Sequence, residues 1–216
     1  AIQSRPLAQL AEIVGDDIVA ELNGPTAQRA TQALGHSAVL SVNSTGAGGG
    51  VAEMLRVVLG YARDAGIDAR WLVIDGNERF FHITKRLHHA LHGSAGDGSP
   101  LGANERRVSE DTLRSNAVEL ESRVRAGDVV VLLDPQTRGL AAGARELGAR
   151  VVWRCHVGRD SSNGDVALAW QFLAPYLKDV EAAIFSRAVY APEGLGDLRV
   201  VVIAPSLDPF SAKNQE

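Results

Sequence analysis

The chain has 216 residues, of which 45% are hydrophobic and 22% are charged, and its formal net charge is −4. This composition excludes a disordered chain, and the length allows a core that needs no disulfide or metal. The scattered basic residues argue against nucleic acid as a partner, and no apolar run approaches the roughly 20 residues of a membrane span, so a membrane is not expected either. The single cysteine, Cys155, is typical of a reducing compartment, and we expect a cytoplasmic protein.

Residues 1–36 are predicted to form an N-terminal helical segment. Apolar residues recur at helical spacing from Leu7 to Ile18. The tripeptide Asn23-Gly24-Pro25 should break this pattern before a second short helix that ends near Leu34. The remainder, residues 37–216, is predicted to be an α/β core.

The α/β core is predicted from apolar runs of strand length that alternate with helical patterns. Helices are expected near residues 51–65, 78–91, 109–126, 138–147 and 164–178, and residues 93–103 should form a surface loop. Strands joined mostly by helices indicate one Rossmann-like domain with a doubly wound, mainly parallel sheet and helices on both faces. The predicted strands are Ser37–Val42, Ala69–Ile74, Val129–Leu133, Arg150–Cys155, Ala182–Phe185 and Val200–Ala204.

A glycine-rich loop follows the first predicted strand and precedes the clearest helix. It contains Gly46, Gly48, Gly49 and Gly50. Glycines let the backbone approach a ligand, and amides that open a helix can hold a phosphate or a sugar oxygen. The spacing matches neither a dinucleotide-binding fingerprint nor a Walker A loop. A ligand-binding loop is favoured over a tight turn that needs glycine for packing alone.

Two polar residues directly follow predicted strands. Ligands of open α/β sheets bind beyond the carboxyl ends of the strands, where Asp134 could orient or deprotonate a hydroxyl group. His156 could act as an acid, a base or a hydrogen-bonding group. A turn aspartate and a structural histidine are equally compatible with these positions. Cys155 should face the other side of its strand as a buried, inert thiol.

A histidine cluster lies on the predicted helix 78–91. His88 and His92 are four residues apart, with His82 and His89 nearby. This spacing could bind a metal, but the pattern fixes no third ligand, so we expect a solvated basic face of the helix. From the residues alone, a polar small molecule is predicted at the carboxyl edge of the sheet, with its chemistry left open.

Several segments, taken together, resemble the trehalose glycosyltransferring synthases of retaining glycosyltransferase family 4. They occur in order over nearly the whole chain. These segments are Val42–Glu53, Gly66–Trp71, Phe80–His88, Asp134–Gln136, Trp153–His156, Ile184–Ser186 and Ala204–Pro209.

The resemblance implies the N-terminal, acceptor-side domain of an enzyme with the GT-B fold. Such an enzyme transfers glucose reversibly from a nucleoside diphosphate glucose to free glucose and forms α,α-trehalose with retention. No cofactor beyond the donor sugar is implied, and a non-essential magnesium ion is left open. The resemblance also implies a donor-binding C-terminal domain, which this chain is expected to lack, so that the chain alone should be inactive.

The resemblance also assigns roles to individual residues. Asp134 would position the acceptor, and His156 would contact the donor glucose and stabilise charge at the reacting carbon. The glycines from Gly46 to Gly50 would line the cleft near the transferred glucose and the diphosphate, with Gln136 and Ser186 as further contacts. The family often has an aspartate soon after the Cys-His pair, whereas Val157-Gly158 follows it here.

Two other classes of function are compatible with the sequence. One is a non-catalytic sugar-binding or interaction domain on the same scaffold, and the other is half of a nicotinamide-dependent oxidoreductase. The glycine spacing counts against the latter. We also expect an apolar patch where a second domain would dock, which could produce a homo-oligomer.

Overall fold

The computed structural model describes residues 2–211, and its centre is one parallel sheet of six strands in the order β2-β1-β3-β4-β5-β6. The prediction of a Rossmann-like, doubly wound α/β domain is therefore confirmed. No helix within residues 2–211 has the length and apolar character needed to cross a membrane. The strands are β1 Val39–Asn43, β2 Ala69–Val73, β3 Val129–Leu133, β4 Arg150–Cys155, β5 Ala182–Phe185 and β6 Arg199–Val202.

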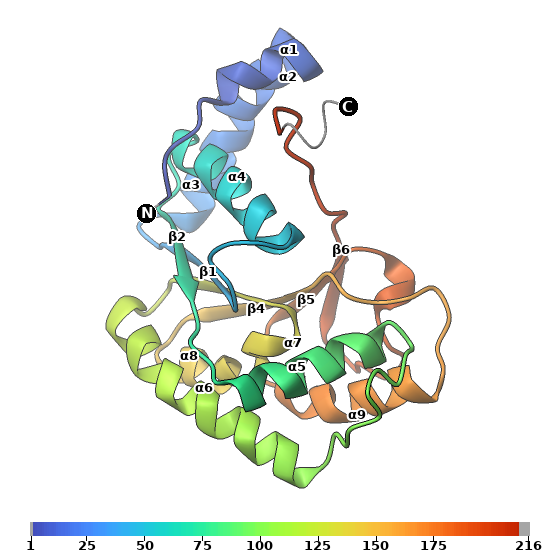
Figure 1. Cartoon of the computed structure of the whole chain (residues 1–216). Helices are drawn as coiled ribbons and strands as arrows, with labels where there is room; N and C mark the ends of the chain where they lie inside the picture. The colour runs from blue at the N-terminus through green and yellow to red at the C-terminus, as the bar shows by residue number, and fades with distance from the viewer. Residues whose placement is uncertain (1, 212–216) are drawn as a thin grey trace.

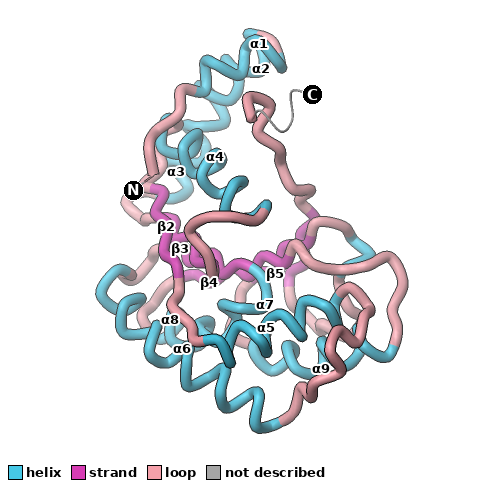
Figure 2. The backbone as a smooth tube through the Cα atoms, in the orientation of Figure 1, coloured by secondary structure: helices cyan, strands magenta, loops and turns pink. Residues whose placement is uncertain are grey.

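Helices cover both faces of the sheet but cover them unequally (Figures 1 and 2). The strand-connecting helices α5, α6, α8 and α9 lie on one face, and α4 lies on the other with α1–α3 beyond it. On the α4 side, Val152, Arg154 and Ile184 of β4 and β5 stay only half-buried. The helices are α1 Ala11–Val14, α2 Asp16–Glu21, α3 Ala27–Leu34, α4 Gly50–Asp64, α5 Glu78–Leu91, α6 Ala103–Arg123, α7 Asp134–Thr137, α8 Ala141–Glu146 and α9 Gly164–Leu177.

The N-terminal segment differs from the prediction at Gly15 and at Asn23-Gly24-Pro25. Gly15, with a φ of 87°, separates α1 from α2 where one continuous helix was expected. The expected break at Asn23-Gly24-Pro25 is wrong, since Leu22–Thr26 stays helical as a wide π turn. Proline has no N–H to donate, and a local widening of the helix accommodates its ring.

Helix α6 begins six residues before the predicted cap at Ser109. Glu105 in its first turn accepts a hydrogen bond at 3.0 Å from the backbone N–H of Gly102, which precedes the helix. This contact satisfies a backbone donor that would otherwise be free and fixes the start of the helix. Ser109 is consequently fully buried inside α6 instead of capping it.

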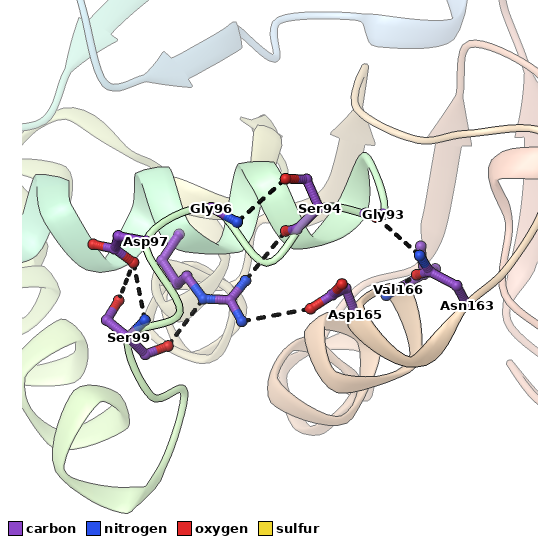
Figure 3. Close-up of polar contacts among 9 residues, drawn as sticks. Gly93, Ser94, Gly96, Asp97, Ser99, Asn163, Asp165 and Val166 are labelled. Atoms are coloured by element: carbon purple, nitrogen blue, oxygen red, sulfur yellow. Dashed lines mark hydrogen bonds and ion pairs between the residues drawn. The ribbon is translucent and has the colours of Figure 1, made fainter.

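The side chain of Arg86 in α5 ties the loop between α5 and α6 to the rest of the domain. It is 5% exposed, donates a hydrogen bond at 2.9 Å to the carbonyl of Ser99 and lies 3.6 Å from Asp165 of α9, and Figure 3 shows these two partners. Asn163, which caps α9, donates to the carbonyl of Gly93 at 2.9 Å. The predicted surface loop is thus anchored at both α5 and α9.

The connections reverse direction between β1 and β3. From β1 the chain moves through α4 to β2 at the edge, then crosses back through α5 and α6 to β3 on the other side of β1. Right-handed crossovers in opposite directions place α4 and α5 on opposite faces. The loops after β1 and β3 therefore diverge, and the crevice between them is where ligands of such sheets bind.

Candidate functional site

A cavity of about 450 Å³ lies at the carboxyl ends of β1 and β3. Its size is within the range of sites that hold small molecules. Its wall comes from the glycine loop, the start of α4, the end of α5, the α7 turn, the residues after β4 and the segment after β6. The lining residues are Asn43, Ser44, Thr45, Gly48, Gly49, Gly50, Val51, Ala52, Met54, His88, His92, Leu133, Asp134, Gln136, His156, Val157, Pro205, Ser206 and Leu207.

The glycine loop is anchored at its start by hydrogen bonds of Asn43 at the end of β1. Its side-chain amide donates to the carbonyl of Thr45 at 2.8 Å, and its oxygen accepts from Trp71 Nε1 at 2.8 Å. Gly48 and Gly49 have φ values of 75° and 80°, a region that residues with a Cβ rarely adopt. Helix α4 begins at Gly50, which lines the cavity. The positive end of its dipole thus lies in the cavity wall, where it favours an electronegative group.

Asp134 has an unusual backbone conformation, with a φ of 61°. Aspartate tolerates this left-handed region better than most residues, although Pro135 after it disfavours helical backbone angles at this position. Trp153 Nε1 donates to the carbonyl of Asp134 at 3.0 Å and holds the conformation in place. The turn directs the carboxylate along the edge of the sheet, toward the end of β4.

The carboxylate of Asp134 binds His156 through one oxygen. Oδ1 accepts the backbone N–H of His156 at 2.8 Å and lies 3.2 Å from its Nδ1. An ionised carboxylate can only accept, so Nδ1 carries the proton, and Nε2 of a neutral ring has a free lone pair. This arrangement fixes both the tautomer and the orientation of the imidazole.

Two buried polar atoms in the wall have no partner among the described residues. They are Nε2 of His156 and Oε1 of Gln136. Leaving such atoms unpaired costs about 1–3 kcal/mol each, so buried polar atoms nearly always find a hydrogen-bond partner. Both atoms belong to residues of the cavity wall, so hydroxyl groups of a ligand are partners of the right chemistry for them.

Arg138 supports the α7 turn from below and was not anticipated from the sequence. It is 2% exposed, and its guanidinium donates to the carbonyl of Pro135 at 2.6 Å and to Ser109 Oγ at 3.1 Å. It lies 4.9 Å from the ring centroids of both Phe172 and Tyr176. Burial is the main cause that lowers the pKa of Arg138, to about 10, so the side chain stays charged at neutral pH.

The structure brings most of the predicted site residues to this cavity. Asp134, His156, Gln136 and the run from Gly48 to Gly50 line it.

Gly46 and Ser186 do not line the cavity, and their expected contacts with the ligand are not supported. The carbonyl of Gly46 instead accepts a hydrogen bond from Arg56 of α4 at 3.0 Å. Ser186 follows β5 and is half-buried outside the cavity wall.

The expectation that the histidines form a solvated basic face is wrong for His88, which is half-buried, whereas His92 is exposed as expected. Both line the cavity, where their ring centroids lie 4.7 Å apart, and His88 is half-buried. Their i, i+4 spacing showed that they share one face of a helix but not that this face meets the ends of the strands. His82, by contrast, is exposed and pairs with Asp97 at 2.9 Å.

The histidines do not form a recognisable metal centre. Within residues 2–211 there is no group of three or more histidine, cysteine, aspartate or glutamate side chains that could hold a metal ion. The thiol of Cys155 is fully buried and donates to the carbonyl of Val157 at 3.3 Å, and burial raises its pKa well above the usual value. The prediction that the thiol is buried is confirmed, and its inertness stays a prediction.

The sheet order and the position of the cavity place the chain in the class of Rossmann-like, doubly wound α/β domains that bind ligands at the carboxyl ends of their strands. It is similar to a solved structure titled α,α-trehalose 6-phosphate synthase from Burkholderia multivorans. The TM-score is 0.55 over 78% of this chain and 47% of the other, with 16% sequence identity. At this identity the similarity shows the fold alone.

The chain belongs to the family of trehalose synthase N-terminal domains, since the family model described as "Trehalose synthase, N-terminal domain" matches residues 41–192. The trehalose synthase of Rubrobacter xylanophilus is 34% identical over 97% of this chain and 48% of its own length. That of Thermococcus litoralis is 32% identical over 99% of this chain and 49% of its own. The chain thus spans about half the length of these relatives.

Proposed function

We propose that this chain is the acceptor-side half of a retaining glycosyltransferase that transfers glucose from a nucleoside diphosphate glucose to free glucose. The product is α,α-trehalose, and the reaction is reversible. The observation that carries the proposal is the Asp134–His156 pair, which leaves His156 Nε2 without a hydrogen-bond partner; Oε1 of Gln136, another residue of the cavity wall, also lacks one. Sequence corresponding to the second half of the relatives would supply the nucleotide site and the opposite wall of the cleft.

The proposed roles follow from which atoms remain free. His156 Nε2 accepts a hydroxyl of the transferred glucose, and the Asp134 carboxylate keeps the ring in place and favours positive charge near the reacting carbon. The amides around Gly49 and the start of α4 attract the electronegative diphosphate. Retaining transfer through an oxocarbenium-like state depends on such positioning and charge stabilisation more than on a strong nucleophile. No cofactor beyond the donor sugar is needed.

Sugar binding by the chain itself provides the first test. Glucose and trehalose are titrated into the isotope-labelled chain, and amide chemical shifts of Gly48, Gly49 and His156 are followed by NMR. Saturable shifts that are lost in the Asp134→Asn variant support the proposal. The absence of any response to both sugars contradicts it.

Transfer requires the second half. The chain is joined to the C-terminal half of the Rubrobacter xylanophilus relative, and trehalose formation from glucose and a nucleoside diphosphate glucose is measured. Turnover that His156→Ala abolishes supports the enzymatic role. The control is the relative itself, reassembled from its own two halves. If this control is active but the chimaera binds sugar without turnover, a non-catalytic sugar-binding domain is favoured instead.

A further inference from the structure

His88 and His92 form the part of the cavity wall that α5 contributes. They lie in the last turn and at the C-cap of this helix, and their rings meet edge to face with centroids 4.7 Å apart. Neither imidazole makes a hydrogen bond to another side chain within the described residues. Both rings are therefore available to a ligand in the cavity.

The electrostatics of this end of the cavity disfavour an anion. None of the described residues that line the cavity is a lysine or an arginine, and the only charged side chain in the wall is the carboxylate of Asp134. The carboxyl end of α5 adds the negative end of a helix dipole. The amino end of α4 has the opposite polarity, so the electrostatic potential differs between the two walls of the cavity. The α4 wall suits a phosphate, and the α5 wall suits an uncharged group.

The protonation state of His88 fits the uncharged side. Burial, first, and then the neighbouring His92 and His89 lower the pKa of His88, against the opposing effect of Asp134, and the net direction is downward. At neutral pH the ring is uncharged and has one donor and one acceptor. A sugar hydroxyl offers the same pair, whereas a phosphate oxygen only accepts and would be better served by a cation.

We infer that His88, with His92 one turn further along α5, is a specificity-determining residue of the acceptor end of the cavity and selects an unphosphorylated hexose over a hexose phosphate. This inference rests on the proposed function, since it assigns the α5 wall to the acceptor. It predicts that the sugar that binds there contacts His88 through a hydroxyl group and that a phosphoryl group on the sugar weakens binding.

The test compares glucose with glucose 6-phosphate in calorimetric titrations of the whole chain. The wild-type chain should bind glucose at least tenfold more tightly than glucose 6-phosphate. His88→Ala should weaken glucose binding roughly tenfold, the equivalent of one hydrogen bond of about 1.4 kcal/mol. His88→Lys should reverse the preference, because it places a cation in a wall that has none. His89→Gln, on the same helix but outside the cavity, is the matched control and should change neither affinity.

Circular dichroism and amide NMR spectra confirm that each variant is folded before its affinities are compared. Equal binding of the two sugars by the wild type, or unchanged affinities in His88→Ala and His88→Lys, overturns the inference. If glucose binding then still depends on Asp134, the proposed function survives while the role of His88 does not. If the wild type binds neither sugar, both are wrong.

Discussion

Asp134 and His156 are 22 positions apart in the chain, yet a single carboxylate oxygen of Asp134 contacts both the backbone N–H and the imidazole Nδ1 of His156. The register of two neighbouring strands explains this proximity. Leu133, the last residue of β3, is paired with Arg154 in β4, so the residues that follow each strand emerge side by side. The sheet therefore positions the proposed catalytic pair before any ligand is present, which is the preorganisation that charge stabilisation requires.

Replacement of Asp134 by asparagine should separate its chemical role from its structural one. The amide oxygen of the new side chain can still accept the His156 N–H, and asparagine tolerates the positive φ, so stability should change little. The affinity for glucose should fall roughly 10- to 100-fold, because a hydrogen bond to a charged group contributes about 1.5–3 kcal/mol. Calorimetric titration and urea unfolding measure the two quantities. A large loss of stability with intact binding would contradict the assignment.

The glycine loop allows a matched comparison between two adjacent glycines. Gly49→Ala forces a side chain into a φ of 80° and should lower the free energy of unfolding by about 1–2 kcal/mol. Gly50→Ala starts a helix at an ordinary φ, and neither position has a neighbouring atom within 4 Å of an added Cβ. The alanine at 50 should thus cost almost nothing. Urea unfolding of both variants tests this difference, and equal losses would argue against backbone strain as the cause.

The stability of the domain should depend on pH through His88. Its pKa is lowered in the folded chain by burial first, below the usual value near 6.5. The unfolded state therefore binds more protons just below pH 6.5, so the folded state loses stability as the pH falls through that value. Urea unfolding between pH 7.5 and 5 should show this decline, and His88→Gln should reduce its slope. An unchanged slope in His88→Gln would show that His88 does not contribute. The control is His89→Gln on the same helix.

Arg138 should matter for the site as well as for stability. Arg138→Met removes the donor to the Pro135 carbonyl and leaves that oxygen unpaired, at a cost of about 1–3 kcal/mol. The α7 turn then loses its support, and glucose affinity should fall although Arg138 does not line the cavity. Arg138→Lys should not restore affinity, since an ammonium cannot reproduce the planar fork that reaches both Pro135 and Ser109. Full affinity in the lysine variant would refute this.

Asp128 provides a structural counterpart at the opposite edge of the sheet. Its carboxylate accepts the backbone N–H groups of Ala38 at 2.8 Å and Arg125 at 2.9 Å, at the amino ends of β1 and β3. Asp128→Ala leaves both donors unpaired and should lower the free energy of unfolding by about 2–5 kcal/mol. Asp128→Asn, which keeps an acceptor oxygen, should lose less. Under folding conditions glucose affinity should stay unchanged in both variants, and a specific loss of binding would show long-range coupling to the cavity.

The fold was predictable because strands buried in a parallel sheet have short, continuous apolar sequences such as Val129–Leu133. Part of the site was predictable from the rule that ligands of open α/β sheets bind beyond the carboxyl ends of the strands. This rule located Asp134, His156 and the glycine loop. The rule does not say which strand ends reach the cavity, because residues that follow β4 and β6 line it. Ser186 after β5, which the family resemblance suggested, does not line it.

The remaining site residues depend on packing that a sequence does not display. His88 and His92 reach the cavity only because the crossover from β2 to β3 brings the end of α5 to the strand ends. Arg138 would be assigned to the surface by its charge, yet Phe172 and Tyr176 of α9 stack on its guanidinium. Both cases are contacts between elements far apart in the chain, which local patterns do not encode.

An ion pair of 3.0 Å joins Arg5 to Asp208, 203 positions further along the chain. Asp208 directly follows Pro205–Leu207, which complete the cavity wall. During vectorial synthesis Arg5 leaves the ribosome long before its partner exists, and a contact of such large sequence separation forms late in folding. The cavity wall is consequently completed only after Pro205–Leu207 have been synthesised, so it is among the last parts of the nascent domain to form.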